Sequence, residues 1–284
     1  MSLEQRRRVG VDMLWRFLTT GDQDTEPVTT PELNTTSPLY NITTSTIWEQ
    51  VGSDIQAGHV RIFAWNDTAN DWTQRGSDLL GEAESGRFGW SVALSGSGDT
   101  VVCGAPYRDM DISRPDTGQL KVFKWNETLS DYVVWGSLHE GPGYTWERWG
   151  YDVDVSDDGL TLASIAPSGW EGSMSSARVW GWNFTIEDWS PMGLNIEVDR
   201  FGNSLALSSD GRTMAVSGLN ANSTTGEANV GKTRVLKWDG FSEWVQVGWV
   251  QVGSSSEIYG EAAEIYGEAA GDESGWSIDL SADG

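Results

Sequence analysis

The stretch FGWSVALSGSGDTVVCGAP, residues 88–106, contains two apolar segments joined by a glycine-containing turn. Phe88, Trp90 and Val92 alternate with smaller or polar residues, which is the pattern of a strand with one buried face. The residues SGSGD supply turn chemistry, and a second apolar run follows them. The stretch therefore predicts a β-hairpin.

The hairpin pattern returns three times along the chain. It recurs as WGYDVDVSDDGLTLASIAP (149–167), FGNSLALSSDGRTMAVSG (201–218) and SGWSIDLSADG (274–284). A further strand ends in a tryptophan in each repeat, at Trp65, Trp125, Trp182 and Trp238. A fourth strand then opens with an aromatic residue, at Trp72, Tyr132, Trp189 and Trp244. We interpret these aromatic residues as packing pairs of neighbouring strands.

Repeats of four short strands are typical of a β-propeller. The sequence thus predicts an all-β fold of four-stranded blades, with about three complete blades and partial blades at both ends. The complete blades are expected at about 88–138, 149–196 and 201–253. The propeller repeats as a whole are expected over residues 47–284 and look truncated at the C-terminal end. Either the last strand completes the first blade of a four-bladed ring or the chain is part of a longer propeller, and the second interpretation is favoured.

The remaining segments differ in composition. Residues 1–23 combine an arginine run with a short apolar stretch and are expected to form at most a short helix. Residues 24–46 are rich in Thr and Pro and are predicted to be a disordered linker. Residues 244–270 contain two immediate duplications, of WVQVG and of EIYGEAA, which we interpret as an insertion tolerated in a surface loop.

Charge and cysteine content exclude several functional classes. The 42 acidic and 18 basic residues give a formal net charge of −24, which opposes nucleic-acid binding. The single cysteine, Cys103, excludes an intramolecular disulfide, and its apolar strand predicts a buried side chain. His59 and His139 have no nucleophile motif near them, so a hydrolase triad is not expected.

The repeats resemble FG-GAP repeats, the units of the propeller in integrin α chains. The resemblance rests on Phe88-Gly89 with Gly104-Ala105-Pro106 and on the corresponding residues of the next two repeats. It implies an extracellular or cell-surface protein that serves adhesion or ligand binding, with membrane anchoring only if a span precedes this chain. An enzyme is not expected, because the residues that recur do so where packing requires them. The calcium loop of many FG-GAP blades, D-x-D-x-D-G, is absent, so the resemblance transfers no calcium site and no cofactor is expected.

The predicted binding surface is formed by the loops between strands 2 and 3 and between blades. We expect these loops to bind a protein or a glycan, because exposed aromatic and arginine side chains on a rigid scaffold are common anchors. The candidates are Tyr107, Arg108, Arg114, Tyr144, Trp146 and Trp170. The acidic residues Asp109, Asp111 and Asp116 are better explained as a solvated loop than as a metal site.

Six sequons are candidates for N-glycosylation and are consistent with an extracellular protein. They are Asn34, Asn41, Asn66, Asn126, Asn183 and Asn222. Two alternatives to the adhesion module stay open. One is a catalytic propeller that acts on glycans with carboxylates at its central channel, and the other is a structural module of a longer surface protein.

Overall fold

The computed structural model describes residues 40–45, 58–82, 85–137, 139–140, 146–167, 175–198, 202–222, 226, 228–247 and 264–284. These residues form strands, turns and loops and contain no helix, so the prediction of an all-β fold is confirmed. No helix that is long and apolar enough to cross a membrane occurs in these ranges. The possible helix within 1–23 lies outside the described residues.

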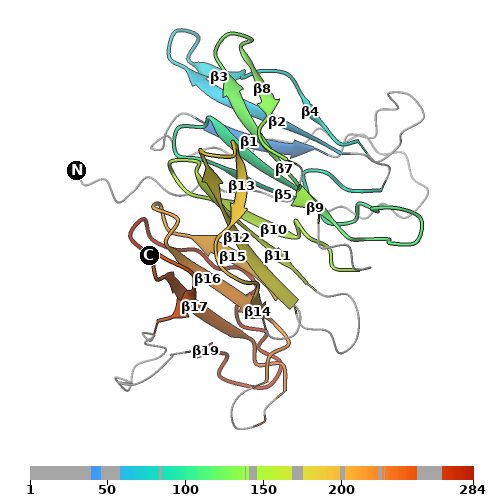
Figure 1. Ribbon diagram of the computed structural model, residues 1–284, viewed down its shortest axis with the longest axis vertical. Coiled ribbons are helices and arrows are strands. Elements are labelled where there is room, and N and C mark those ends of the chain that lie inside the picture. Colours follow the sequence, from blue (N-terminus) through green and yellow to red (C-terminus); the bar gives the residue numbers. More distant parts are fainter. Residues whose placement is uncertain are drawn as a thin grey trace.

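Four antiparallel sheets follow one another along the chain, and in Figure 1 they run from the first sheet at the top to the last at the bottom. Sheet 1 contains β1 (Tyr40–Ser45), β2 (His59–Asn66), β3 (Asp71–Gln74) and β4 (Leu79–Leu80). Sheet 2 contains β5 (Ser91–Leu94), β6 (Thr100–Ala105), β7 (Gln119–Asn126), β8 (Asp131–Val134) and β9 (His139–Glu140). Sheet 3 contains β10 (Asp152–Val155), β11 (Thr161–Ala166), β12 (Ser175–Asn183), β13 (Asp188–Pro191) and β14 (Ile196–Val198). Sheet 4 contains β15 (Gly202–Leu207), β16 (Thr213–Gly218), β17 (Lys232–Trp238), β18 (Trp244–Gln246) and β19 (Glu264–Tyr266).

Each complete repeat forms one sheet with its first four strands in sequence order. The expected outer strand is broken in two, because both β8 and β9 pair with β7 and the same split occurs in the other sheets. In sheet 4, β18 belongs to the first WVQVG copy and β19 to the second EIYGEAA copy, and the other copy of each motif falls between these strands in the sequence. The duplication therefore lengthens the break in an outer strand and leaves the pairing of β17 with both halves in place.

Sheet 1 differs from the sequence-based expectation at its N-terminal side. The strand β1 pairs with β2 over its whole length, although it lies inside residues 24–46, which were predicted to be a disordered linker. The linker prediction is thus wrong for 40–45, where backbone pairing with a well-formed neighbouring strand outweighs the polar composition. β1 takes the position that β6 has in sheet 2, and no described strand pairs with its other edge.

The hydrophobic core is divided into three clusters, each between two consecutive sheets. The first includes Val60 and Ile62 from β2 together with Val101 from β6, all fully buried. The second joins sheets 2 and 3, and the third joins sheets 3 and 4. One face of β6 therefore contacts sheet 1 while its other face contacts sheet 3, which explains its continuous apolar sequence. Cys103 is buried in this strand, as predicted.

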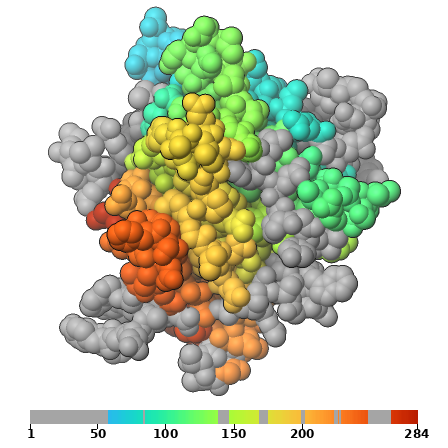
Figure 2. All heavy atoms as spheres, viewed as in Figure 1, coloured from blue at the N-terminus to red at the C-terminus, as the bar shows by residue number. Residues whose placement is uncertain are grey.

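A repeated contact, which we call the joint, connects the outer parts of consecutive sheets. The residue after the first outer segment of each sheet donates its backbone N–H to the long strand beside it, which is β2, β7, β12 or β17. These residues, which we call insertion residues, are Arg75, Trp135, Met192 and Val247. The first three lie next to the aromatic pair of the following sheet. Trp135, for example, contacts Trp182 and Trp189, with ring centroids 4.1 and 5.0 Å away. On the face seen in Figure 2, the green, yellow and orange outer hairpins of sheets 2, 3 and 4 adjoin one another.

The glycine after the insertion residue lets the sheets approach. At Gly136, whose φ is +79°, an added Cβ would lie 2.7 Å from the Trp189 ring and 2.8 Å from the Asp188 carboxylate. Asp188 in turn accepts a hydrogen bond from Ser137 N at 2.7 Å. Gly76 and Gly193 have the same position in the other joints. The joint thus requires a residue without a side chain at this point.

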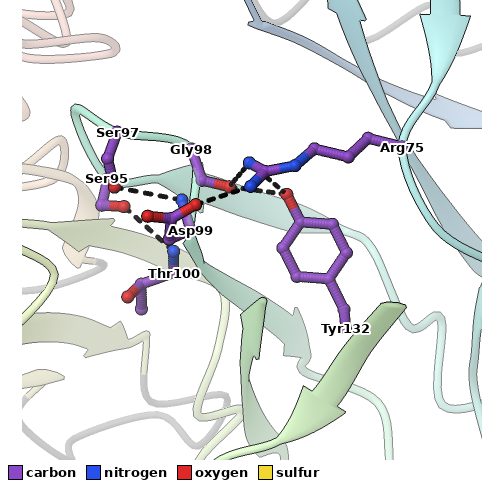
Figure 3. A network of polar contacts seen from close by, with 7 residues as sticks. All are labelled: Arg75, Ser95, Ser97, Gly98, Asp99, Thr100 and Tyr132. Atoms are coloured by element: carbon purple, nitrogen blue, oxygen red, sulfur yellow. Dashed lines mark hydrogen bonds and ion pairs between the residues drawn. The ribbon is translucent and has the colours of Figure 1, made fainter. Parts of the chain in front are cut away.

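Sheets 1 and 2 use an arginine in this joint (Figure 3). Arg75 Nη1 donates to the Gly98 carbonyl at 2.9 Å, and Nη2 forms an ion pair with Asp99 at 2.7 Å. The guanidinium lies 4.2 Å from the centre of the Trp125 ring. Tyr132 donates its hydroxyl to the same Gly98 carbonyl. Arg75 therefore combines the stacking role of Trp135 with charge-assisted hydrogen bonds.

Candidate functional site

A cluster of aromatic and arginine side chains lies where sheets 2 and 3 meet. Antiparallel pairing puts the start of β5, the end of β6 and the start of β10 at the same end of these sheets. The residues beside these strand ends form what we call the Tyr107 cluster: Arg87, Trp90, Tyr107, Arg148 and Tyr151. They come from three separate segments of sequence.

Tyr107 is the centre of the cluster. Its ring contacts Trp90 edge to face, with centroids 5.1 Å apart, and Trp90 contacts Tyr151 at 5.5 Å. The guanidinium carbons of Arg87 and Arg148 lie 4.1 and 5.2 Å from the Tyr107 ring centre. Two cations from successive repeats therefore share one aromatic ring in a protein of net charge −24.

The two arginines are held by an unusual backbone. Arg87 has φ of +53° and Arg148 has φ of +61°, and each directly precedes the aromatic residue that opens its repeat. Left-handed conformations are rare for residues with side chains, and they concentrate at functional sites and at repeated turns. Because the same repeat position is left-handed at Glu273, the turn itself accounts for part of this pattern.

Asp116 and Asp152 are carboxyl groups associated with the cluster. Asp116 pairs with Arg148 at 3.4 Å, and both side chains are mostly buried. Burial raises the pKa of Asp116, while Arg148 and Arg87 act in the opposite direction. Tyr151 belongs to the cluster and directly precedes Asp152 in the chain. Burial raises the pKa of the Tyr151 hydroxyl, Tyr107 and Asp152 raise it further, and Arg148 lowers it.

Asp152 has the most strongly altered acidity of these groups. Burial raises its pKa to about 7, although hydrogen bonds to its Oδ2 from Leu205 N at 2.9 Å and from Ser204 Oγ at 3.1 Å favour the charged form. The neighbouring Asp154 raises the pKa further. A carboxyl group with this pKa can both donate and accept a proton near neutral pH.

The candidate residues from the sequence are only partly brought together. Tyr107 belongs to the cluster, and Arg108 is adjacent to it in the chain, with its carbonyl bonded to Gly118 N and Thr117 Oγ1. Arg114 donates a hydrogen bond from its Nε to Asp111 at 2.8 Å. Trp146 is 37% exposed, and its backbone N–H donates a hydrogen bond to the Pro115 carbonyl. Tyr144 and Trp170 lie outside the described residues.

The three acidic loop residues do not converge on one point. Asp109 accepts the backbone N–H of Asp116, and Asp111 binds Ser113 and Arg114, which lower its pKa. Asp116 is paired with Arg148. Throughout the described ranges, no group of three His, Cys, Asp or Glu side chains could hold a metal ion.

The sequons of the repeats have a structural role as turn residues. The Asn66 side chain accepts the N–H groups of Thr68 and Ala69 at 2.9 and 3.0 Å, and Asn126 and Asn183 accept equivalent bonds. Asp239 has the same place and the same bonds in sheet 4, although it cannot be glycosylated. The turn therefore requires a side-chain acceptor, and this explains why Asn recurs. Asn222 accepts Asn229 N, Asn41 lies in β1, and Asn34 lies outside the described residues, so glycosylation at all six stays a prediction.

The sequence analysis missed four residues of the cluster and Asp152. Arg87 and Arg148 each precede the FG or WG pair, and Trp90 and Tyr151 each follow it. Their common repeat position was a usable signal, but the alternation of the strand suggested core packing. Tyr107 contacts residues of two repeats because neighbouring sheets pack against each other. The sequence of a single repeat does not reveal this packing.

Comparison with known proteins changes the family assignment. No family model matches the chain, FG-GAP included, and no curated protein matches it. Two solved structures that resemble it are each named a "putative 6-phosphogluconolactonase", one from Bacteroides uniformis and one from Bacteroides fragilis. The first is 9% identical with a TM-score of 0.40, covering 74% of this chain and 67% of its own. The second is 11% identical with a TM-score of 0.43, covering 69% of this chain and 52% of its own.

The FG-GAP assignment is therefore corrected, and with it the expectation of a non-enzymatic, integrin-like adhesion protein. The residues behind the resemblance have a local packing role that explains them without a common family. A Cβ on Gly104 would lie 2.1 Å from the Gly150 carbonyl oxygen, so the motif marks close contact between neighbouring sheets. Likenesses at these identities and TM-scores do not identify a reaction or a substrate for this chain. The extracellular location stays a prediction.

Proposed function

We propose that the four sheets are consecutive blades of a propeller and that the chain hydrolyses glycosidic bonds at the Tyr107 cluster. The common strand order of the sheets and the contacts of β10 with both β5 and β15 support the blade arrangement. Catalysis is supported by Asp152, a carboxyl group with a pKa of about 7 that accepts hydrogen bonds from Ser204 and Leu205 of sheet 4 and directly follows Tyr151 of the cluster in the chain.

Glycoside hydrolysis uses two carboxyl groups, one of which protonates the leaving oxygen while the other attacks or activates water. Asp152 suits the first role, because burial raises its pKa to about 7 and a group with this pKa can hold a proton near neutral pH. Its Oδ1 accepts one bond, from Val153 N at 3.0 Å, and retains a lone pair. The second role would fall to Asp116, the carboxyl group that pairs with Arg148 of the cluster, although burial raises its pKa.

The other cluster residues would bind the sugar. Trp90 and Tyr107 are half-buried and present ring surface, which packs against the apolar C–H faces of a pyranose. Arg87 is exposed, and it would donate hydrogen bonds to sugar hydroxyl groups and stabilise negative charge on a leaving oxygen. The same residues form one surface at the ends of β5, β6 and β10.

The test is a panel of aryl glycosides, assayed with purified protein between pH 4 and pH 9. Asp152→Asn is expected to lower kcat by about 10²- to 10⁴-fold, because the amide cannot transfer the proton. Asp158→Asn, in the turn after β10, is the matched control and should keep the wild-type rate. A folded Asp152→Asn protein with unchanged kcat would refute this site, and a wild-type protein inactive on the whole panel would refute glycoside hydrolysis.

A further inference from the structure

One position of the repeat, near the start of the first strand, carries a serine in sheets 2 and 4 and an aspartate in sheet 3. Ser91 of β5, Asp152 of β10 and Ser204 of β15 each lie three residues after the aromatic residue that opens the repeat. In sheet 2 the Ser91 hydroxyl donates a hydrogen bond to the Gly150 carbonyl of the next sheet at 2.8 Å. Asp152 therefore places an acidic group where the neighbouring repeats have a neutral hydroxyl.

The Asp152 carboxyl group is held across the boundary between sheets 3 and 4. Its Oδ2 accepts hydrogen bonds from Leu205 N at 2.9 Å and from Ser204 Oγ at 3.1 Å. A β-bulge between Gly202 and Leu205 interrupts the pairing of β15 with β16 at this point, and bulges commonly redirect side chains beside active sites. Because two donors occupy Oδ2, the proton of the neutral acid resides on Oδ1.

Ser204 is itself fixed by its surroundings. Its residue is 9% exposed, and its backbone N–H donates to Ser217 Oγ at 3.3 Å. The Ser217 hydroxyl donates in turn to the Gly275 carbonyl at 2.6 Å. The Ser204 hydroxyl is therefore presented by an anchored backbone, and such support is what keeps a functional side chain in one orientation.

Few ionisable groups surround Asp152. The strands β5, β11 and β15 contain none, and β6 contributes only Cys103, which belongs to the core cluster between sheets 1 and 2. On β10 itself, Asp154 and Tyr151 are the ionisable neighbours, and Asp154 Oδ2 accepts Leu207 N at 2.6 Å. The charged form of Asp152 is thus stabilised by hydrogen bonds from β15 and from Val153 N.

We propose that Ser204 is a positioning residue, which orients the Asp152 carboxyl group so that Oδ1 presents its proton to the substrate. The assignment rests on the proposed function, in which Asp152 protonates the leaving oxygen. In that step the O–H bond at Oδ1 breaks, a new O–H bond forms on the leaving oxygen, and negative charge spreads to Oδ2. The Ser204 hydroxyl donates to this charge, and hydrogen bonds to ionised groups are stronger than bonds between neutral groups.

The experiment compares three variants of the full chain. Ser204→Ala removes the hydroxyl and Ser204→Thr keeps it. Ser208→Ala is the matched control, because Ser208 Oγ also donates to a carboxyl group, that of Asp210 at 2.7 Å, in the turn after β15. Carboxyl carbon-13 shifts between pH 4 and pH 9 give the pKa of Asp152, whose signal is the one missing from Asp152→Asn. The values of kcat and KM are measured on an aryl glycoside that the wild type hydrolyses.

Ser204→Ala should raise the pKa of Asp152 by about 1 unit, since the charged form loses a donor, and should lower kcat about 10-fold with little change in KM. Ser204→Thr and Ser208→Ala should match the wild type in both measurements. An unchanged pKa of Asp152 in Ser204→Ala, or an equal loss of kcat in Ser208→Ala, would overturn the proposal. A wild type inactive on every glycoside would refute the proposed reaction and with it the catalytic role of Ser204, whereas the titration, which needs no substrate, decides separately whether the hydroxyl holds Asp152.

Discussion

Replacing Asp152 by asparagine tests the electrostatics of the boundary between sheets 3 and 4. The pKa of Asp152 rises from 3.8 in the unfolded chain to about 7 in the fold, so the folded state binds its proton more tightly. Between these two values the folded state carries more protons than the unfolded state, and stability falls as the pH rises. Each pKa unit is worth about 1.4 kcal/mol, so ionisation of Asp152 costs up to about 4 kcal/mol at pH 7 and almost nothing at pH 4.

An asparagine at this position would keep an oxygen acceptor for the Leu205 N–H and would carry no charge. Asp152→Asn should therefore have nearly wild-type stability at pH 4 and exceed it by about 2 to 4 kcal/mol at pH 7, the lower figure allowing for partial solvent exposure. Urea unfolding followed by tryptophan fluorescence at pH 4, 5, 6 and 7 measures the difference. A constant difference across this range, or a variant less stable at pH 7 than at pH 4 relative to wild type, would show that the Asp152 carboxyl is not destabilised by burial.

Three further changes test the joint and the turns. Gly136→Ala should destabilise the fold by about 2 to 3 kcal/mol in thermal or urea unfolding, because it combines a positive φ with a steric conflict. The control Gly226→Ala also has a positive φ, but its added Cβ meets nothing within 4 Å, so it should cost about 1 kcal/mol. Arg75→Met keeps an apolar side chain in the joint but loses charge-assisted hydrogen bonds, so calorimetry should show a loss of about 2 kcal/mol, and an unchanged melting temperature would contradict this role. Asn126→Ala should cost about 1 kcal/mol and Asn126→Asp almost nothing, since Asp239 forms the same turn in sheet 4; equal losses in chemical denaturation would argue against the turn explanation.

The strands of the complete repeats could be predicted from sequence because their determinants are local. Alternation around Val92 and the turn residues after it specify a hairpin without reference to the rest of the fold. β1 was not predictable in this way, since its composition is polar and its pairing is with β2. The break between β8 and β9 was also missed, because a few unpaired residues inside a strand leave no periodic signal.

The candidate site was less predictable than the strands. The sequence identified Tyr107 as an exposed aromatic residue in a loop, but its neighbours Arg87 and Arg148 come from two repeats. Only the packing of sheet 2 against sheet 3 brings them to one ring. The raised pKa of Asp152 likewise depends on the burial of its side chain where β10 packs against β15. Its neighbours in the sequence predicted only an ordinary strand.

The broken outer strand makes this architecture tolerant of changes in length. In sheet 4, Leu236 of β17 pairs with Gln246 of β18, and Arg234 of β17 pairs with Glu264 of β19. The two outer segments therefore pair with adjacent parts of β17, although 17 residues separate them in the sequence. The break in each of the other sheets offers an equivalent point of entry. Epitope tags, fluorescent labels or whole small domains could be placed there, at the periphery of a sheet, with the inner strands and the Tyr107 cluster undisturbed.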